Sequence, residues 1–155
     1  MRYFTLNELC RSDKAERLGI ANNPNTEQQN NLISLVEDVL DPARIMYGKA
    51  ICVSSGFRCA KLNSAVGGET NSQHKQGQAA DLYTKDGAKG NLELAKTIIR
   101  LGRYDQLILE NVGPNDLLPQ WVHVSWRSDG KNRQQILKKV AGKKGYMALT
   151  KNALL

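Results

Sequence analysis

The sequence predicts an α+β domain in which a small, mainly antiparallel sheet is flanked by helices. Helix signals fill the chain up to Gly48, and short β-type runs mixed with helices follow. The 155 residues are enough for one domain with a core of its own. The hydrophobic content of 41% and charged content of 24% are typical of a globular protein. No stretch approaches the roughly 20 apolar residues of a membrane span.

Three helix starts are predicted in the N-terminal third, two of them from capping patterns. Thr5–Glu8 has the pattern of a capping box, which predicts a short helix, and a second brief helix is expected between Ser12 and Gly19. Thr26–Gln29 repeats the capping pattern and predicts a longer helix, which Pro42 is expected to kink or restart and Gly48 to end. The core face of that helix is an apolar stripe at helical spacing: Leu32, Leu35, Val36, Val39 and Leu40.

The remaining chain alternates short strands with helices. Strands are predicted over residues 51–57, 79–83, 104–110 and 121–126, and helices over residues 60–66, from Asn91 to Leu101 and from about Asn132 onward. No repeat or low-complexity linker divides the sequence. We therefore expect a single domain over residues 1–140, followed by a basic C-terminal tail over residues 141–155.

The net charge of +7 is concentrated near the C-terminus. From Arg127 onward the chain holds eight Lys and Arg residues and a single acid, Asp129, whereas bases and acids balance before it. Such a segment can attract a polyanion, and a solvated helix face explains it equally well. Nucleic acid is the partner that we least expect, because the sequence has no zinc knuckle, RNP motif or basic recognition helix.

The three cysteines, Cys10, Cys52 and Cys59, are too few and too irregularly spaced for a disulfide scaffold. We expect them to be small, mostly buried apolar residues, and whether Cys52 and Cys59 pair across a predicted turn stays open. The N-terminal residues 1–8 lack the apolar segment of a secretory signal.

The only two histidines, His74 and His123, lie in contexts that suit metal ligands. After His74, Gly77 permits a tight turn that can return Asp81 towards the imidazole. Alternation along the strand over residues 121–126 places His123 on one face together with the residues two positions away. Two imidazoles and one carboxylate are a ligand set of catalytic zinc sites, in which the fourth position is left for water. The absence of cysteine ligands argues against a closed structural site.

Longer blocks around these residues resemble the M15 peptidases. They are SSGFR at Ser54–Arg58, LNSAVGG at Leu62–Gly68, SQHKQGQAAD at Ser72–Asp81, DQLI at Asp105–Ile108 and WVHVS at Trp121–Ser125. The resemblance extends over residues 3 to 137. It implies the fold that this family shares with the hedgehog signalling domain. The implied activity is that of zinc D-Ala-D-Ala carboxypeptidases and endolysin-type L,D- or D,D-peptidases, which are often found in prophages.

Carried over position by position, the resemblance implies that His74, Asp81 and His123 bind zinc. It gives Arg58 the role of binding the substrate carbonyl or the oxyanion that forms from it, which suits a permanently charged, forked donor. Ser72 would lie beside the cleft, where it would hydrogen-bond the substrate or support a ligand.

The sequence departs from the family pattern at Gln120. Many members carry an Asp or Glu three residues before the last histidine ligand as general base, so Gln120 is left as a substrate-binding candidate. Glu110 is our first candidate for the base, because it ends a strand expected beside that of His123. Asp105 is the second candidate and Asp116 the third. Alternation puts Asp105 and Glu110 on opposite faces, so we do not expect both to line the site.

The sequence thus predicts a monomeric zinc metallopeptidase that hydrolyses a peptide bond in the peptidoglycan stem peptide, as a carboxypeptidase or an endopeptidase. A non-catalytic, zinc-containing module that binds the cell wall is the alternative, because of Gln120. The basic tail would then contact anionic wall polymers. Since no signal peptide is recognised, we expect synthesis in the cytoplasm and action at the cell wall after release by another route, such as a phage holin.

Overall fold

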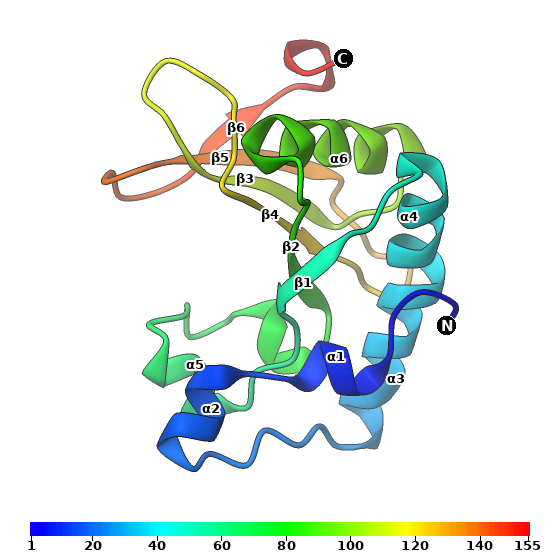
Figure 1. Ribbon diagram of the computed structural model, residues 1–155, viewed down its shortest axis with the longest axis vertical. Helices are drawn as coiled ribbons and strands as arrows, with labels where there is room; N and C mark the ends of the chain where they lie inside the picture. Colours follow the sequence, from blue (N-terminus) through cyan, green and yellow to red (C-terminus); the bar gives the residue numbers. More distant parts are fainter.

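The computed structural model describes residues 1–155, and its first third is helical (Figure 1). The predicted cap Thr5 opens the first helix: its Oγ1 accepts a hydrogen bond from the Glu8 backbone N–H at 3.1 Å, whereas the return bond of a capping box, from the Thr5 N–H to the Glu8 side chain, is not formed. Ser12 Oγ caps the second helix by accepting from the Ala15 backbone N–H at 3.1 Å. The helical elements of this region are α1 (Leu6–Cys10), α2 (Asp13–Leu18), α3 (Thr26–Leu35), the π-helical turn η1 (Val36–Leu40) and α4 (Asp41–Tyr47).

The capping box of α3 lies one residue before the predicted position. Asn25 Oδ1 accepts from the Gln28 backbone N–H at 2.8 Å, and Gln28 Oε1 accepts from that of Asn25 at 2.9 Å, so Asn25 and not Thr26 is the cap. The predicted restart at Pro42 is confirmed, since Pro42 lies in the first turn of α4. Gly48 ends this helix with a φ of 78°, as expected.

The rest of the chain forms a six-stranded sheet in the order β1-β2-β4-β3-β5-β6. Only the β3–β5 pair is parallel, which confirms the predicted α+β class with a mainly antiparallel sheet. The strands are β1 (Cys52–Ser55), β2 (Ala79–Tyr83), β3 (Gln106–Val112), β4 (Trp121–Ser125), β5 (Gln135–Val140) and β6 (Met147–Leu149). The remaining helical elements are α5 (Ala60–Ala65), α6 (Gly87–Leu101) and the 3₁₀ turns η2 (Gln73–Gln76) and η3 (Lys151–Ala153).

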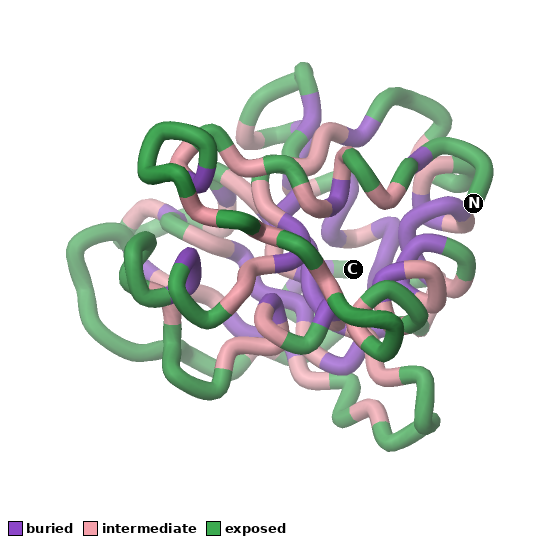
Figure 2. Tube along the Cα trace, turned by 90° about the horizontal axis from the view of Figure 1, so that it is seen from below, coloured by how far each residue is buried: buried purple, intermediate pink, exposed green.

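Alternation along the strands gives the sheet one apolar face and one polar face. On β2, β3 and β4, the side chains that alternate with the polar ones are buried in the core, where α6 packs against these strands: Ala80, Leu82, Leu107, Leu109, Val122 and Val124. Figure 2 shows the buried segments at the centre of the molecule, with exposed loops around them. The opposite face of the same three strands is therefore free to carry a polar site.

Helix α6 begins earlier than predicted, and Asn91 does not cap it. The helix starts at Gly87, and Asn91 is buried inside it. The Asn91 amide accepts from the Thr84 backbone N–H at 2.8 Å and donates to the carbonyl oxygens of Pro119 and Gln120 at 3.0 and 2.9 Å. Asn91 thus holds the loop before β4 against the helix, a tertiary role that a cap pattern does not reveal.

The predicted C-terminal helix is wrong. The region after Asn132 forms β5, which pairs with β3, and then the edge strand β6. Its run of Ile136, Leu137 and Val140 supplies apolar side chains to both faces of the sheet, and this packing outweighs the helical propensity of the lysines between them. Leu154 is buried in the main core, so the segment 141–155 packs against the domain.

None of the helices is both long and apolar enough to cross a membrane. The cysteines Cys10, Cys52 and Cys59 are all free thiols, and all three are half-buried.

Candidate functional site

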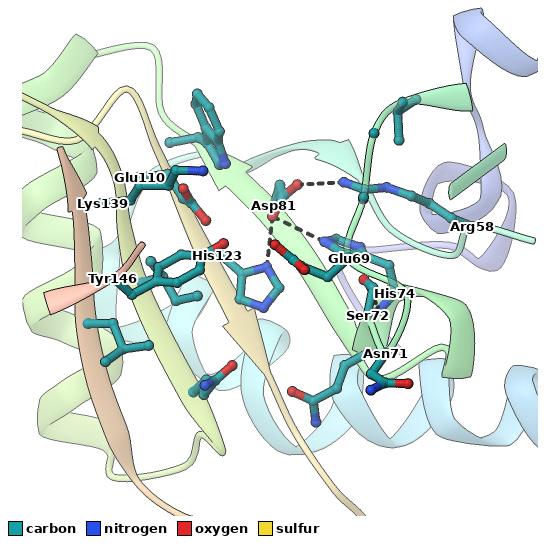
Figure 3. Close-up of a pocket in the computed structure, with 18 of the residues that line it drawn as sticks. Arg58, Glu69, Asn71, Ser72, His74, Asp81, Glu110, His123, Lys139 and Tyr146 are labelled. Atoms are coloured by element: carbon teal, nitrogen blue, oxygen red, sulfur yellow. Dashed lines mark hydrogen bonds and ion pairs between the residues drawn. The ribbon is translucent and has the colours of Figure 1, made fainter. Parts of the chain in front are cut away.

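His74, Asp81 and His123 converge on the polar face of the sheet, as the sequence predicts (Figure 3). Asp81 lies on β2, His123 lies directly opposite it on β4, and His74 lies on η2. The Asp81 Oδ1 atom is 3.3 Å from His74 Nε2 and 3.0 Å from His123 Nδ1. One ligand atom from each residue lies within 4.8 Å of the other two. Three donor atoms therefore share one small volume.

The turn that carries His74 is short and fixed at both ends. Ser72 Oγ accepts a hydrogen bond from the His74 backbone N–H at 3.2 Å and so caps η2. Gly77 ends the turn with a φ of 73°, and a Cβ there would collide with the Gln28 carbonyl oxygen. The predicted role of Gly77 in the tight turn is thus confirmed, because the left-handed conformation and the close approach both favour glycine.

A backbone carbonyl determines which nitrogen of His74 faces the cluster. The His74 Nδ1–H donates to the Gly56 carbonyl oxygen, with a separation of 2.7 Å, which leaves the lone pair of Nε2 for the cluster. Gly56 itself lies against α1, where a Cβ would overlap the Leu9 carbonyl oxygen. The neighbouring Phe57 backbone N–H donates to that same oxygen at 2.7 Å. Helix α1 therefore holds the carbonyl that orients His74.

The electrostatics of the cluster favour a cation. Burial lowers the pKa of His74 more than the nearby Asp81 raises it, so this imidazole is neutral at neutral pH. Burial alone would raise the pKa of Asp81, but the two imidazoles outweigh it and hold the pKa well below its ordinary range. The cluster thus combines a carboxylate with a neutral imidazole, which is the protonation state that metal ligands need.

The two distances from Asp81 are close to those around a tetrahedral metal ion. Ligand atoms that share a zinc ion at about 2.0–2.2 Å lie about 3.3–3.6 Å from one another. The two separations from Asp81 Oδ1, 3.3 and 3.0 Å, are close to that spacing. Three side chains that could hold a metal ion meet at this point, and none is a cysteine, which is the donor set of catalytic sites rather than closed structural ones.

Arg58 lies beside the cluster and is held by three side chains. Its Nε donates to Ser55 Oγ at 2.9 Å, one Nη donates to Asn63 Oδ1 at 3.4 Å, and the other donates to Asp81 Oδ2 at 3.2 Å. The contact with Asp81 occupies one carboxylate oxygen and leaves the other to the imidazoles. Arg58 also lines the cavity, so its two remaining N–H donors can reach a bound molecule.

The cluster forms part of the lining of a cavity of about 540 Å³. The cavity floor is the polar face of β2, β3, β4 and β5, and one wall is the segment from Val66 to His74. The lining side chains on the strands are Asp81, Gln106, Ile108, Glu110, Trp121, His123, Leu137 and Lys139, and Arg133 and Tyr146 complete the rim.

Glu110 is the one carboxylate on the cavity floor outside the cluster. It lies opposite Trp121 in the β3–β4 pair, so it is a diagonal neighbour of His123 on the same face, at about 7–8 Å between Cα atoms. Burial raises the pKa of Glu110, although the nearby His123 and Lys139 partly offset this effect. Figure 3 shows Glu110 and Lys139 at one end of the cavity, across from Arg58.

The other predicted residues lie in different places. Ser72 lines the cavity, whereas Gln120, Asp105 and Asp116 do not. Gln120 is exposed and meets Glu110 only through its backbone N–H, which donates to the Glu110 carbonyl at 2.9 Å. Asp105 is fully buried in an ion pair with Arg133, and Asp116 accepts backbone hydrogen bonds within its own loop.

Sequence reasoning did not identify the C-terminal part of the lining. Arg133, Lys139 and Tyr146 reach the cavity only because β5 joins the sheet beside β3 and the chain then folds back into β6. The Lys139 ammonium lies 5.5 Å from the centre of the Tyr146 ring. Burial raises the pKa of Tyr146, and the carboxylates of Glu110, Glu69 and Asp81 raise it further. The sequence signal that could place Lys139 in the cavity is the alternation over Ile136–Val140, and it can be used only once that run is recognised as a strand.

In a comparison with protein families, residues 2–112 match the family model described as Peptidase M15. The match includes His74 and Asp81 and ends before His123, so the structure adds the third member of the cluster. A comparison with curated proteins finds no match.

Proposed function

The chain belongs to the M15 family of metallopeptidases, and from this premise we propose that it is a zinc enzyme that hydrolyses a peptide bond in the peptidoglycan stem peptide. The observation that carries the proposal is the cluster of His74, Asp81 and His123 on the floor of an open cavity. Zinc is the metal that best suits two imidazoles, one carboxylate and a free position. When bound there, it would polarise the scissile carbonyl and make a water molecule acidic.

In this proposal Glu110 is the general base. It lines the cavity near His123, and its raised pKa brings its proton affinity closer to that of a base working near neutral pH. It takes a proton from the water that adds to the carbonyl carbon and gives it to the leaving nitrogen as the C–N bond breaks. The products are a carboxylic acid and an amine. Asp105 is less suited to this task, since four hydrogen bonds already surround its carboxylate.

Arg58 has two tasks in this proposal. Its bond to Asp81 Oδ2 fixes the carboxylate so that Oδ1 faces the imidazoles. Its unused N–H donors stabilise the negative charge that develops on the carbonyl oxygen during attack. Its contacts with Ser55 and Asn63 hold the guanidinium in one orientation, so little rearrangement is required when that charge forms. Ser72, which caps the turn of His74 and lines the cavity, is positioned to support the substrate beside it.

Digestion of purified peptidoglycan tests the proposal. The protein is first stripped with a chelator and then supplied with zinc, and soluble products are identified by mass spectrometry. We expect release of D-Ala or cleaved stem peptides only with the metal, and loss of this release in the Glu110→Gln variant while zinc still binds. Zinc bound at one ion per chain without cleavage of several wall types would instead favour the non-catalytic module that Gln120 suggested.

A further inference from the structure

Asp105 is a buried charge that the proposed reaction does not use. Its side chain is 0% exposed, although it lies just before β3 at the edge of the cavity. Burying a carboxylate is costly unless hydrogen bonds replace the lost water. Arg133 donates to Oδ1 from its backbone N–H at 2.8 Å and from Nε at 3.1 Å, and to Oδ2 from one Nη at 2.8 Å. Gln73 Nε2 adds a fourth bond, to Oδ2 at 2.9 Å.

Both side-chain partners of Asp105 line the cavity. Gln73 directly precedes the cluster residue His74, and the Arg133 side chain is 53% exposed. The two-point contact between the guanidinium and the carboxylate fixes the plane as well as the position of the arginine. The buried charge therefore sets the orientation of two groups on the cavity wall.

Arg133 still has donors that point away from this contact. Its Nε and one Nη bind Asp105, and the other Nη makes no hydrogen bond or ion pair within the protein. A guanidinium has five N–H donors in a fixed plane, so at least the two on that Nη can bind another group. A guanidinium held in one orientation matches a carboxylate best among protein groups, because its planar pair of N–H donors can bind both carboxylate oxygens.

The turn that carries Arg133 is also well fixed. Asn132 Oδ1 accepts from the Arg127 backbone N–H at 2.8 Å, and Asn132 Nδ2 donates to the Arg127 carbonyl oxygen at 2.9 Å. Gln134, which has a positive φ of 53°, donates from its amide to the Gly102 carbonyl at 2.6 Å. Because these contacts order the arginine before any ligand arrives, binding to it loses little conformational entropy.

The sheet register indicates how far Arg133 lies from the cluster of His74, Asp81 and His123. On β3, Ile108 lies opposite His123, and Gln106, two residues earlier, lies opposite Gln135 at the start of β5. Two residues of a strand span about 7 Å. Gln135 also lies two strands away from His123, at about 4.8 Å per strand, and Arg133 precedes it by two residues. An extended peptide whose scissile bond lies at the cluster thus reaches the region of Arg133 within about four residues.

We infer that Arg133, positioned by Asp105, binds a carboxylate of the peptide substrate within about four residues of the scissile bond, and so makes the protein select anionic peptides over their amides. This inference rests on the proposed function for its substrate class. Arg58 also lines the cavity, but the proposed reaction already uses its free donors for the carbonyl oxygen. Lys139 is the other competing cation, and it lies near Glu110, against the Tyr146 ring. It is a flexible point charge and lacks a fixed fork.

Three synthetic stem pentapeptides test the inference: L-Ala-γ-D-Glu-L-Lys-D-Ala-D-Ala, its C-terminal carboxamide, and the form in which the D-Glu α-carboxylate is an amide. We measure kcat/KM for each with the zinc-loaded protein, together with Kd by calorimetry. One of the two amides should be cleaved about 10- to 100-fold less efficiently than the parent, as expected for the loss of hydrogen bonds to a charged group. The Arg133→Gln variant should lose this selectivity, and Arg133→Lys should retain part of it.

The matched control is Lys131→Gln, which removes the same charge from the same turn at an exposed side chain that lies outside the cavity lining. It should keep the full selectivity. The ratio between acid and amide separates a binding role from a purely structural one, because a loss of folded protein reduces both rates equally. Equal rates for all three peptides with the unmodified protein, or unchanged selectivity in Arg133→Gln, would overturn the inference, as would loss of selectivity in Lys139→Gln alone.

The proposed function can fail separately. If no peptide is cleaved, the calorimetric Kd still reports whether the parent binds more tightly than one amide and whether Arg133→Gln abolishes the difference. Binding selectivity without cleavage would refute the peptidase and retain the carboxylate site, and absence of any binding preference would refute the site itself.

Discussion

Asp81 and Asp105 are both buried carboxylates beside the same cavity, but their neighbours are of opposite kinds. Around Asp81 Oδ1 the nearest groups are two imidazole nitrogens, at 3.3 and 3.0 Å, and Arg58 binds only the other oxygen. Around Asp105 four N–H donors bind the two oxygens. The first arrangement concentrates lone pairs and attracts a cation, whereas the second is already satisfied. Burial of a carboxylate therefore does not by itself indicate a metal site.

We expect the largest effect when the two carboxylates Asp81 and Asp105 are each replaced by Asn and compared. Asp81→Asn removes the only charged ligand of the cluster, so we expect the hydrolysis rate to fall about 10⁴-fold or more and zinc to be lost on dialysis. Asp105→Asn should keep zinc at one ion per chain. Metal content by mass spectrometry and the rate of stem-peptide cleavage measure both outcomes. If Asp105→Asn lost zinc as readily as Asp81→Asn, the contrast between the two sites would be wrong.

Glu110 provides a second test, since it lies in the cavity without belonging to the cluster. Replacing it with Gln keeps the shape and removes the proton acceptor, so kcat should fall about 10³-fold while the zinc Kd changes little. Steady-state kinetics and a competition assay with a zinc chelator give the two numbers. A nearly normal kcat in the Glu110→Gln variant would show that another group acts as the base.

Gly56 tests whether the orientation of His74 depends on helix α1. A methyl group at this position would collide with the Leu9 carbonyl oxygen and displace the carbonyl that accepts the His74 Nδ1–H. Loss of such an orienting partner lowers metal affinity about 10- to 100-fold, which we expect for Gly56→Ala in a chelator competition. Gly19→Ala is the control: its φ of 64° also disfavours a side chain, but it lies in the cap of α2, away from the cavity, so it should lower stability and leave the zinc affinity unchanged.

The sequence identified the cluster more completely than the rest of the cavity. Gly77 closes the turn of His74 and brings Asp81 back towards it, which a local pattern predicts. His123 lies opposite Asp81 through a long-range strand pair, and the resemblance to the M15 family, rather than a local pattern, joined it to the other two. Arg133 and Lys139 were missed because their position depends on the long-range pairing of β5 with β3. Six lysines and one arginine over residues 131–151 resemble a solvated helix or tail, and a local pattern does not reveal that sheet pairing directs two of these cations into a cavity.

Asp105 should contribute to stability in a pH-dependent way that is independent of the metal. Burial would raise its pKa, but the hydrogen bonds from Arg133 and Gln73 outweigh this effect and lower it. A group whose pKa is lower in the folded state stabilises the protein above its unfolded pKa of about 4, and this contribution is lost as the pH falls through the folded value. Asp105→Asn should reduce the free energy of unfolding by about 2–4 kcal/mol at pH 7 and by less at pH 3. Urea unfolding of the metal-free protein at both pH values tests this, and an equal loss at the two would contradict it.

Gln120→Glu should have the smallest effect, and it bears on the one position that departs from the family pattern. The resemblance places a general base at this position, yet the Gln120 side chain is exposed and lies outside the cavity lining, and only its backbone contacts Glu110. A carboxylate introduced there should therefore change kcat less than about 3-fold, because it is not placed to take a proton from a water molecule at the cluster. In the Glu110→Gln background it should also fail to restore activity. Rescue of that double variant would instead show that the loop before β4 can bring residue 120 into the cavity, and that Glu110 and residue 120 are alternative positions for one base.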